Sequence, residues 1–294
     1  MKNFECLMCP RMCRVDRKNQ FGYCGEGLNP RIALVSLHQW EEPCLVGNNG
    51  AGTIFFSGCS MRCCYCQNFE ISQRGGFGIE VTIDRLAEIF IEQQNRGAEN
   101  LDLVTPTHFS EQIIESLKIA RKENFMLPVV YNSSGYENIE TLEKLRGFVD
   151  IFLPDLKYYS DSTAEEFSNA PNYFETATRA IKKMFELVGE IELRNGILKR
   201  GMIVRHLILP NHRKESLKIL DWLFENFQNK IFVSIMRQYV PMKNVPSVIS
   251  RRLTTFEYDS VVEHAIKLGF ENIFVQEKDS AKAEFIPVFD GTNI

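Results

Sequence analysis

The sequence predicts an α/β protein in which a parallel β-sheet is covered by helices on both faces. From residue 53 onward, short apolar segments alternate with amphipathic segments six or seven times. The apolar segments are hydrophobic throughout, as in strands buried on both faces, and the amphipathic segments follow the helical repeat. Strands joined by helical crossovers pair in parallel, so this order favours a complete or incomplete barrel, with a doubly wound open sheet as the alternative.

The expected elements follow one another in regular order. Thr82 and Gly97 mark the start and the end of the first helix after the cysteine loop, because Thr caps helix N-termini and Gly ends helices. The predicted strands are 53–57, 101–105, 127–132, 149–155, 202–209, 230–235 and 272–276. The predicted helices are 82–97, 110–124, 138–147, a stretch that ends near Gly189, 213–227 and 259–269. Functional residues are expected at the carboxyl ends of the strands, as in barrels and open α/β sheets.

Residues 1–50 lack this alternation. They contain cysteines, prolines and glycines but no sustained apolar period, which predicts a small loop-rich segment held by a metal. We therefore expect an N-terminal metal-binding extension over residues 1–50 and a barrel domain over residues 51–294. His38, Glu41 and Glu42 are expected in a solvated charged turn, with metal or substrate contact as the alternative.

The composition is that of a globular protein, with 44% hydrophobic and 24% charged residues among 294. The first residues lack the apolar region of a signal peptide, and no stretch approaches the roughly 18 apolar residues of a membrane span. We therefore expect a cytoplasmic protein that does not contact membranes. The net charge of −4 disfavours a phosphate-backbone partner, so nucleic-acid binding is not expected.

Four of the nine cysteines lie in GCSMRCCYCQN, residues 58–68. Disulfides are rare in reducing compartments, so clustered cysteines there indicate metal or redox chemistry. Cys59, Cys63 and Cys66 have three and two intervening residues, a spacing that lets a short loop hold one inorganic cluster. Three ligands leave one iron with an open position, whereas a structural zinc site is closed by four. Cys64 is then surplus; a set using Cys64 in place of Cys63 and one zinc held by all four cysteines are the alternatives.

The pattern Cys59-x3-Cys63-x-Tyr65-Cys66 resembles that of the radical S-adenosylmethionine (SAM) enzymes. GTIFFSGCSMRCCYCQN, LVTPTH, LPDLKYY and VRHLILPN also resemble a pyruvate formate-lyase activating enzyme-like branch that carries an N-terminal CxxCPRxC segment. The resemblance implies a partial (β/α)6 barrel of the TIM type, with the cysteine loop after its first strand. It also implies a [4Fe-4S] cluster whose open iron binds SAM and cleaves it reductively to methionine and a 5′-deoxyadenosyl radical, which abstracts hydrogen from a substrate.

The resemblance further implies SAM contacts at later strand ends. The family's Gly-Gly-Glu after the second strand is replaced here by a Thr-Pro-Thr-His sequence, so this contact departs from the family pattern, and a turn that leads into a helix is the alternative. The family's aspartate after the third strand corresponds to an asparagine, and its Asp-Leu-Lys after the fourth strand is retained. The residues implied to bind the cofactor are Thr105, Thr107, Asn132, Ser134, Asp155, Lys157 and His206.

Arg205 and His206 are adjacent in an otherwise apolar strand, so only one of them can face the barrel interior. We expect His206 to face inward, because it matches a strand-five histidine of the activating enzymes. Burying Arg205 without a partner would be very costly, so we expect it to meet a polar interior or an anion such as the SAM carboxylate. Gln238 and Tyr239 are expected to line the substrate entrance or to cap the barrel.

A second cysteine set lies near the N-terminus, with two, three and ten intervening residues and with glycines and a proline that supply turns. Four thiolates complete a metal site, so this set is expected to bind either structural zinc or an auxiliary iron-sulfur cluster. Cys44 has no spacing partner and is expected to be an unpaired thiol. The members of the set are Cys6, Cys9, Cys13 and Cys24.

The expected function is that of a radical SAM enzyme, and the resemblance implies the activation of a glycyl radical enzyme. Its partners would be a reductant such as flavodoxin or ferredoxin and a protein substrate. The alternatives are a radical SAM enzyme acting on a small metabolite, a non-catalytic iron-sulfur electron carrier and a zinc-stabilised nucleic-acid-binding module. An electron carrier needs neither a large barrel nor an open iron, and the acidic charge disfavours the nucleic-acid module.

Overall fold

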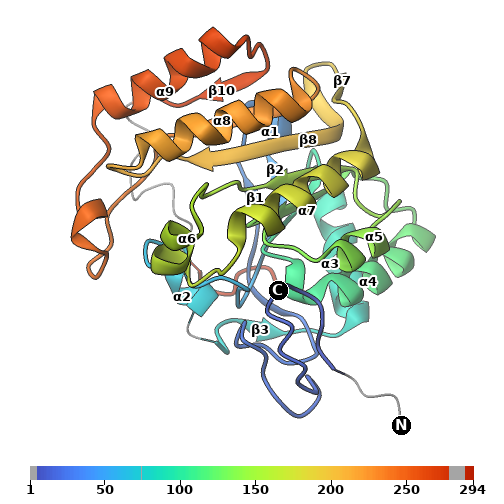
Figure 1. Ribbon diagram of the computed structural model, residues 1–294. Helices are drawn as coiled ribbons and strands as arrows, with labels where there is room; N and C mark the ends of the chain where they lie inside the picture. The colour runs from blue at the N-terminus through green and yellow to red at the C-terminus, as the bar shows by residue number, and fades with distance from the viewer. Residues whose placement is uncertain (1–4, 74, 278–288) are drawn as a thin grey trace.

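The structure is a computed structural model that describes residues 5–73, 75–277 and 289–294. Its centre is a ten-stranded sheet with the order β10-β9-β8-β6-β5-β4-β2-β1-β3, and β7 pairs with β8 (Figure 1). Within the described residues the two edges of the sheet, β10 and β3, do not pair with each other. The predicted α/β class and the partial barrel are therefore confirmed.

The described helices and strands have the following bounds. The strands are β1 (Arg31–His38), β2 (Ala51–Phe56), β3 (Ile79–Glu80), β4 (Leu101–Val104), β5 (Val129–Ser133), β6 (Ile151–Pro154), β7 (Glu192–Arg194), β8 (Ile197–Leu207), β9 (Phe232–Met236) and β10 (Ile273–Val275). The helices are α1 (Pro43–Val46), α2 (Phe69–Gln73), α3 (Ile83–Asn95), α4 (Ser110–Lys122), α5 (Ile139–Lys144), α6 (Asp161–Ser168), α7 (Tyr173–Val188), α8 (Arg213–Phe227) and α9 (Thr255–Leu268). No described helix has the length and apolar character that crossing a membrane requires.

The strands from β2 to β10 along the sheet pair in parallel, as predicted. The helix α3 begins after Thr82, whose hydroxyl accepts a hydrogen bond from the Arg85 N–H at 3.1 Å. The stretch predicted to end near Gly189 forms two helices, α6 and α7. Because parallel strands end at the same edge of the sheet, the loops that follow them are brought together there.

The strand β1 lies in the segment that was expected to be loop-rich. Its residues 32–35 are buried, and it pairs antiparallel with β2, with Ser36 opposite Thr53. After β1, Cys44 and Leu45 of α1 pack inside the barrel against apolar residues of β5, β6, β8 and β9. The predicted boundary at residue 50 therefore falls within the barrel, and the loop-rich segment comprises residues 5–30.

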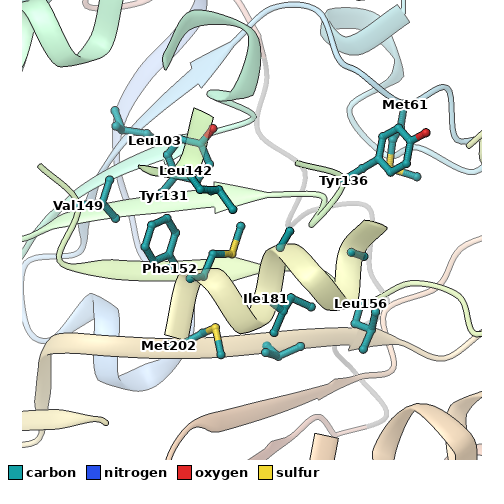
Figure 2. Packing of buried hydrophobic residues seen from close by; sticks show 14 of the residues in the cluster. Met61, Leu103, Tyr131, Tyr136, Leu142, Val149, Phe152, Leu156, Ile181 and Met202 are labelled. Carbon is teal, nitrogen blue, oxygen red and sulfur yellow. The ribbon is translucent and has the colours of Figure 1, made fainter. Parts of the chain in front are cut away.

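The main apolar core lies between the sheet and its helices. Figure 2 shows Phe152 of β6, Ile181 of α7 and Met202 of β8 in this core, and all three are fully buried. Burial of each such side chain contributes about 1.5–3 kcal/mol. The smaller cluster inside the barrel contains residues of β5, β6, β8 and β9, such as Val130 and Ile151. Polar and apolar side chains share the carboxyl ends of the strands.

Glu215 of α8 connects the segment after β6 to the helical layer. Its carboxylate accepts hydrogen bonds from the backbone N–H groups of Tyr159 and Ser160, at 3.1 and 3.2 Å, and from the Thr163 hydroxyl at 2.6 Å. Burial opposes ionisation of this carboxyl group, but the hydrogen bonds to it and His212 outweigh burial and lower the pKa of Glu215 to about 2.

We expect Glu215→Gln to reduce the free energy of unfolding at neutral pH by about 1–3 kcal/mol, because an amide cannot accept all of these bonds. A carboxyl group with a lowered folded pKa adds stability above its unfolded pKa of about 4.3, and this stability is lost as the pH falls toward about 2. Urea unfolding at several pH values checks this expectation, with the exposed Glu225→Gln on the same helix as the control. The expectation would be contradicted if the difference in unfolding free energy between Glu215→Gln and wild type stayed constant down to pH 2.

Candidate functional site

A cavity of about 570 Å³ lies at the carboxyl ends of the parallel strands. Its wall contains residues from the ends of β4, β5, β6, β8 and β9, together with the cysteine loop that follows β2. This volume is typical of sites that bind small molecules. The polar ends of the strands and the cysteine loop therefore face one common space.

Three cysteines of the loop line this cavity, and each sulfur lies close to one hydrogen-bonding group. Such contacts stabilise the thiolate form that binds metals. The contacts are Met61 N–H to Cys59 Sγ at 3.4 Å, Ser168 Oγ to Cys63 Sγ at 2.9 Å and Ser72 Oγ to Cys66 Sγ at 3.3 Å.

Burial raises the pKa of the thiols of Cys59, Cys63 and Cys66, that of Cys66 to about 11. A buried thiol stays protonated until a positively charged centre binds its sulfur. In the part of the chain that the structure describes, no three His, Cys, Asp or Glu side chains lie close enough together to hold one metal ion. The three cysteines on this wall offer soft thiolate ligands, the type that holds iron-sulfur clusters.

Cys64 does not line the cavity. Its N–H donates to the Phe167 carbonyl at 2.8 Å, and its side chain packs against the main core. Its absence from the cavity wall supports the prediction that Cys64 is the surplus cysteine. The assignment of the ligands stays a prediction.

Tyr65 begins a buried chain of hydroxyl groups that ends at Cys63. Its hydroxyl lies 2.5 Å from that of Tyr158, which lies 2.5 Å from the Ser168 hydroxyl, and Ser168 donates to the Cys63 sulfur. Burial raises the pKa of both tyrosines, so their hydroxyl groups keep their protons at neutral pH. The chain joins the cysteine loop to the segment after β6.

Five of the predicted SAM contacts line the same cavity as the cysteines. Thr105 has a φ of 60°, which is uncommon for a β-branched residue and is a form of strain that concentrates at functional sites. Its N–H donates to the Asn132 carbonyl at 2.9 Å, which fixes the two strand ends side by side. The five residues are Thr105, Asn132, Ser134, Asp155 and Lys157.

Asp155 and Lys157 form an ion pair on this wall, with Lys157 Nζ 2.5 Å from Asp155 Oδ2. Burial by itself lowers the pKa of Lys157, but the Asp155 carboxylate and the Cys63 sulfur more than offset it, so the pKa is raised. The Tyr173 hydroxyl donates to the Asp155 carbonyl at 3.1 Å and accepts from the Lys157 N–H at 3.0 Å. The ammonium group is therefore held in a fixed position near the cysteine loop.

His206 faces away from the cavity, so the prediction that it points inward is wrong. Its Nδ1 lies 2.7 Å from the Leu156 carbonyl in a buried position, while the side chain of Arg205 lines the cavity. Side chains alternate along a strand, and Ser234, the β9 partner of Arg205, also lines the cavity. In β9, as in β8, the residue at this level of the sheet therefore points its side chain into the cavity.

Thr107 is also absent from the described cavity wall. Its hydroxyl donates to Glu137 at 2.6 Å, and both side chains are buried. Gln238 does line the cavity, whereas the Tyr239 ring packs against Tyr65 with 5.8 Å between ring centroids. Of the pair after β9, Gln238 is thus the one at the entrance.

Glu41 and Glu42 are buried ion-pair partners of Arg205, so the expectation of a solvated turn is wrong. Glu42 accepts two hydrogen bonds from the Arg205 guanidinium, at 2.8 and 2.6 Å, and Glu41 accepts another. The three side chains line the cavity and are only 13%, 8% and 6% exposed for Arg205, Glu41 and Glu42. The Arg205 guanidinium thus pairs with two carboxylates of the protein itself, and not with the SAM carboxylate that was named as a possible partner.

Asp102 of β4 is a further acidic group that sequence reasoning missed. It is fully buried, and burial together with the nearby Glu41 raises its pKa, which favours the protonated form. The one acidic residue in the apolar stretch LDLVT was the signal that could have identified it.

The N-terminal cysteines lie in loops that pack against the cysteine loop of residues 58–68. Arg11 Nε donates to the Ser60 carbonyl at 2.6 Å, and Arg62 donates to the Tyr23 carbonyl at 3.3 Å. The second cysteine set is therefore next to the cavity wall in space.

Comparison with curated proteins finds two relatives. An uncharacterized protein of Methanocaldococcus jannaschii is 32% identical over 282 residues, which cover 92% of this chain and 77% of that protein. The pyruvate formate-lyase-activating enzyme of Clostridium pasteurianum is 23% identical over 206 residues, which cover 67% of this chain and 79% of the enzyme.

Among solved structures, SuiB of Streptococcus suis bound to S-adenosylmethionine has a TM-score of 0.53 at 10% identity, covering 77% of this chain and 50% of SuiB. The hydrogenase maturase HydG of Carboxydothermus hydrogenoformans has a TM-score of 0.53 at 14% identity, and the match covers 79% of this chain and 55% of HydG. The chain thus spans about half the length of these structures, and they share its fold. The Radical SAM superfamily description matches residues 53–223, more than half of the chain. The chain, with its cysteine loop at the carboxyl ends of an open parallel sheet, therefore belongs to the radical SAM superfamily.

Proposed function

We propose that Cys59, Cys63 and Cys66 hold a [4Fe-4S] cluster and that the strand ends across the cavity bind SAM. The observation that carries this proposal is the position of the three sulfurs, which line the same cavity as the Asp155–Lys157 pair. When bound, the cluster supplies the electron that cleaves SAM to methionine and a 5′-deoxyadenosyl radical.

The chain's own residues orient SAM and exclude water. The Lys157 ammonium is placed to attract the SAM carboxylate, and the Asp155 carboxylate is placed to accept hydrogen bonds from a ribose or an amino group. Thr105 and Asn132 add hydroxyl and amide groups from the two preceding strands. Arg205 does not join them, because Glu41 and Glu42 occupy its guanidinium.

The proposed substrate is a residue of a partner protein, and a glycine to be activated is the specific case. Similarity to the Clostridium pasteurianum activating enzyme supports this choice. SuiB, which shares the fold, has been solved with its precursor peptide SuiA. The proposed reductant is a flavodoxin or ferredoxin, and the proposed location is the cytoplasm, where cysteine ligands stay reduced.

The test is anaerobic reconstitution with iron and sulfide, followed by reduction in the presence of SAM. Formation of 5′-deoxyadenosine supports the radical SAM chemistry, and its absence with an intact cluster would favour a non-catalytic electron carrier. A protein radical seen by electron paramagnetic resonance (EPR) with a glycyl radical enzyme as partner supports the activase role. Turnover that instead requires a small metabolite would replace the activase role with the metabolite alternative.

We expect Ala substitutions of Cys59, Cys63 or Cys66 to remove the iron and the absorbance of the cluster held by this loop, because each removes one of three ligands, while any metal bound by the N-terminal cysteines stays. Cys64→Ala is the matched control and should retain the cluster. Visible absorbance and iron content of the reconstituted variants check this expectation. If Cys64→Ala loses the cluster while Cys63→Ala keeps it, the ligand set is misassigned.

We expect Asp155→Ala and Lys157→Ala to weaken SAM binding about 10- to 100-fold while cluster absorbance is unchanged, because each loses a charge-assisted contact of about 1.5–3 kcal/mol. Calorimetry on the reconstituted variants measures the affinity, with Lys118→Ala on the exposed face of α4 as the control. Normal SAM affinity together with a lower melting temperature would make the pair purely structural.

A further inference from the structure

The N-terminal cysteine set, Cys6, Cys9, Cys13 and Cys24, converges in the loop-rich segment. A Cβ placed on Gly22 would lie 3.3 Å from the Cys24 sulfur and 3.9 Å from the Cys13 sulfur, so these two sulfurs flank the same small space. The Tyr23 N–H donates to the Cys13 sulfur at 3.2 Å. Burial is the main reason that the pKa of the Cys9 thiol is raised, and the nearby thiols of Cys24 and Cys13 raise this pKa further.

Arg17 supplies buried N–H groups near Cys24, and Arg11 has a buried N–H group near the cysteine loop of residues 58–68. Nη2 of Arg11 and both Nε and Nη2 of Arg17 are buried and have no hydrogen-bond partner within the described residues. The third nitrogen of Arg17 donates to the His108 carbonyl, and the positive charge of Arg17 acts on Cys24. Buried guanidinium donors without partners are costly, so an anionic group with acceptor atoms is expected beside them.

Four thiols in one short segment suit either one zinc ion or an iron-sulfur cluster. A cluster adds sulfide atoms that accept hydrogen bonds, whereas a zinc site offers only its four thiolates. The unpartnered donors of Arg17 therefore favour the cluster.

We propose that Cys6, Cys9, Cys13 and Cys24 bind a second iron-sulfur cluster, which Arg17 hydrogen-bonds, and that electrons enter the protein through it. A cluster with four thiolates is anionic and carries sulfide acceptors, which matches the unpartnered guanidinium donors. The electron-entry part rests on the proposed function, whereas the metal assignment does not.

The two cysteine loops are in direct contact. Gly58, which precedes Cys59, has a φ of 80°, and a side chain on it would come within 2.6 Å of the Cys24 carbonyl oxygen. Cys24 and Cys9 are buried, whereas Cys6 and Cys13 are partly exposed. The set therefore has one side toward the cavity loop and one side toward solvent.

This arrangement suits the transfer of one electron at a time. A reduced flavodoxin or ferredoxin gives up one electron at the exposed side, and the N-terminal cluster is reduced by one electron. It would be reoxidised by passing that electron to the cluster proposed at Cys59, Cys63 and Cys66, which would be reduced by one electron. Met12 and Phe21, 48% and 71% exposed, give the exposed side an apolar surface on which such a carrier can dock.

The metal assignment is tested on a Cys59/Cys63/Cys66→Ala triple variant, in which only the N-terminal set remains. After anaerobic reconstitution we expect about four iron and four sulfide ions per chain and an EPR signal on reduction. One zinc per chain without iron, or no metal above background, would overturn the proposal. Arg17→Met in the triple variant should keep the iron but make the reduction potential more negative; an unchanged potential would contradict the contact with Arg17.

The entry role is tested by comparing reductants on a Cys13→Ala/Cys24→Ala variant that retains Cys59, Cys63 and Cys66. Formation of 5′-deoxyadenosine driven by reduced flavodoxin should fall at least about ten-fold, while that driven by dithionite should stay within about two-fold of wild type. Cys44→Ala, outside both sets, is the matched control. Equal loss with both reductants, or no loss with either, would overturn the entry role. If dithionite does not drive SAM cleavage in the wild-type protein, the proposed function is refuted. The metal assignment of the N-terminal cysteine set is not affected by that result.

Discussion

The charge of Arg205 is the constraint on which the barrel interior depends. A guanidinium that is largely removed from water needs compensating carboxylates, and removing such partners costs about 3–5 kcal/mol. Glu41 and Glu42 supply them, so the chain after β1 must turn into the barrel. Leu45 of α1 then fills the apolar end of the interior. The ion-pair cluster thus forms part of the cavity wall, and the segment that supplies its carboxylates also supplies apolar packing inside the barrel.

The polar edge of the sheet follows from this packing. The apolar cluster around Leu45 fills part of the barrel interior, and the space at the carboxyl ends is bordered by the cysteine loop and by polar and apolar residues of the strand ends. The hydroxyl chain from Tyr65 through Tyr158 to Ser168 keeps Cys63 and the segment after β6 in a fixed relation. The structure therefore positions the sulfurs and the Asp155–Lys157 pair as one rigid unit.

Local signals in the sequence were sufficient for the parallel strands and the main helices. The ends of α3 predicted at Thr82 and Gly97 lie within two residues of its observed ends, since capping is decided by neighbouring residues. Contacts between distant residues were not predictable in this way. The partners Glu42 and Arg205 are 163 residues apart, and β1 was missed because it pairs antiparallel with β2 and no long helix follows it. The choice of His206 over Arg205 failed because alternation along a strand allows either residue to face inward.

The parallel strands are held together by backbone hydrogen bonds that do not involve the loops at their carboxyl ends. The loops that border the cavity can therefore change in length and composition while the hydrogen bonds of the sheet stay intact. The same sheet can thus carry cavities of different size and lining.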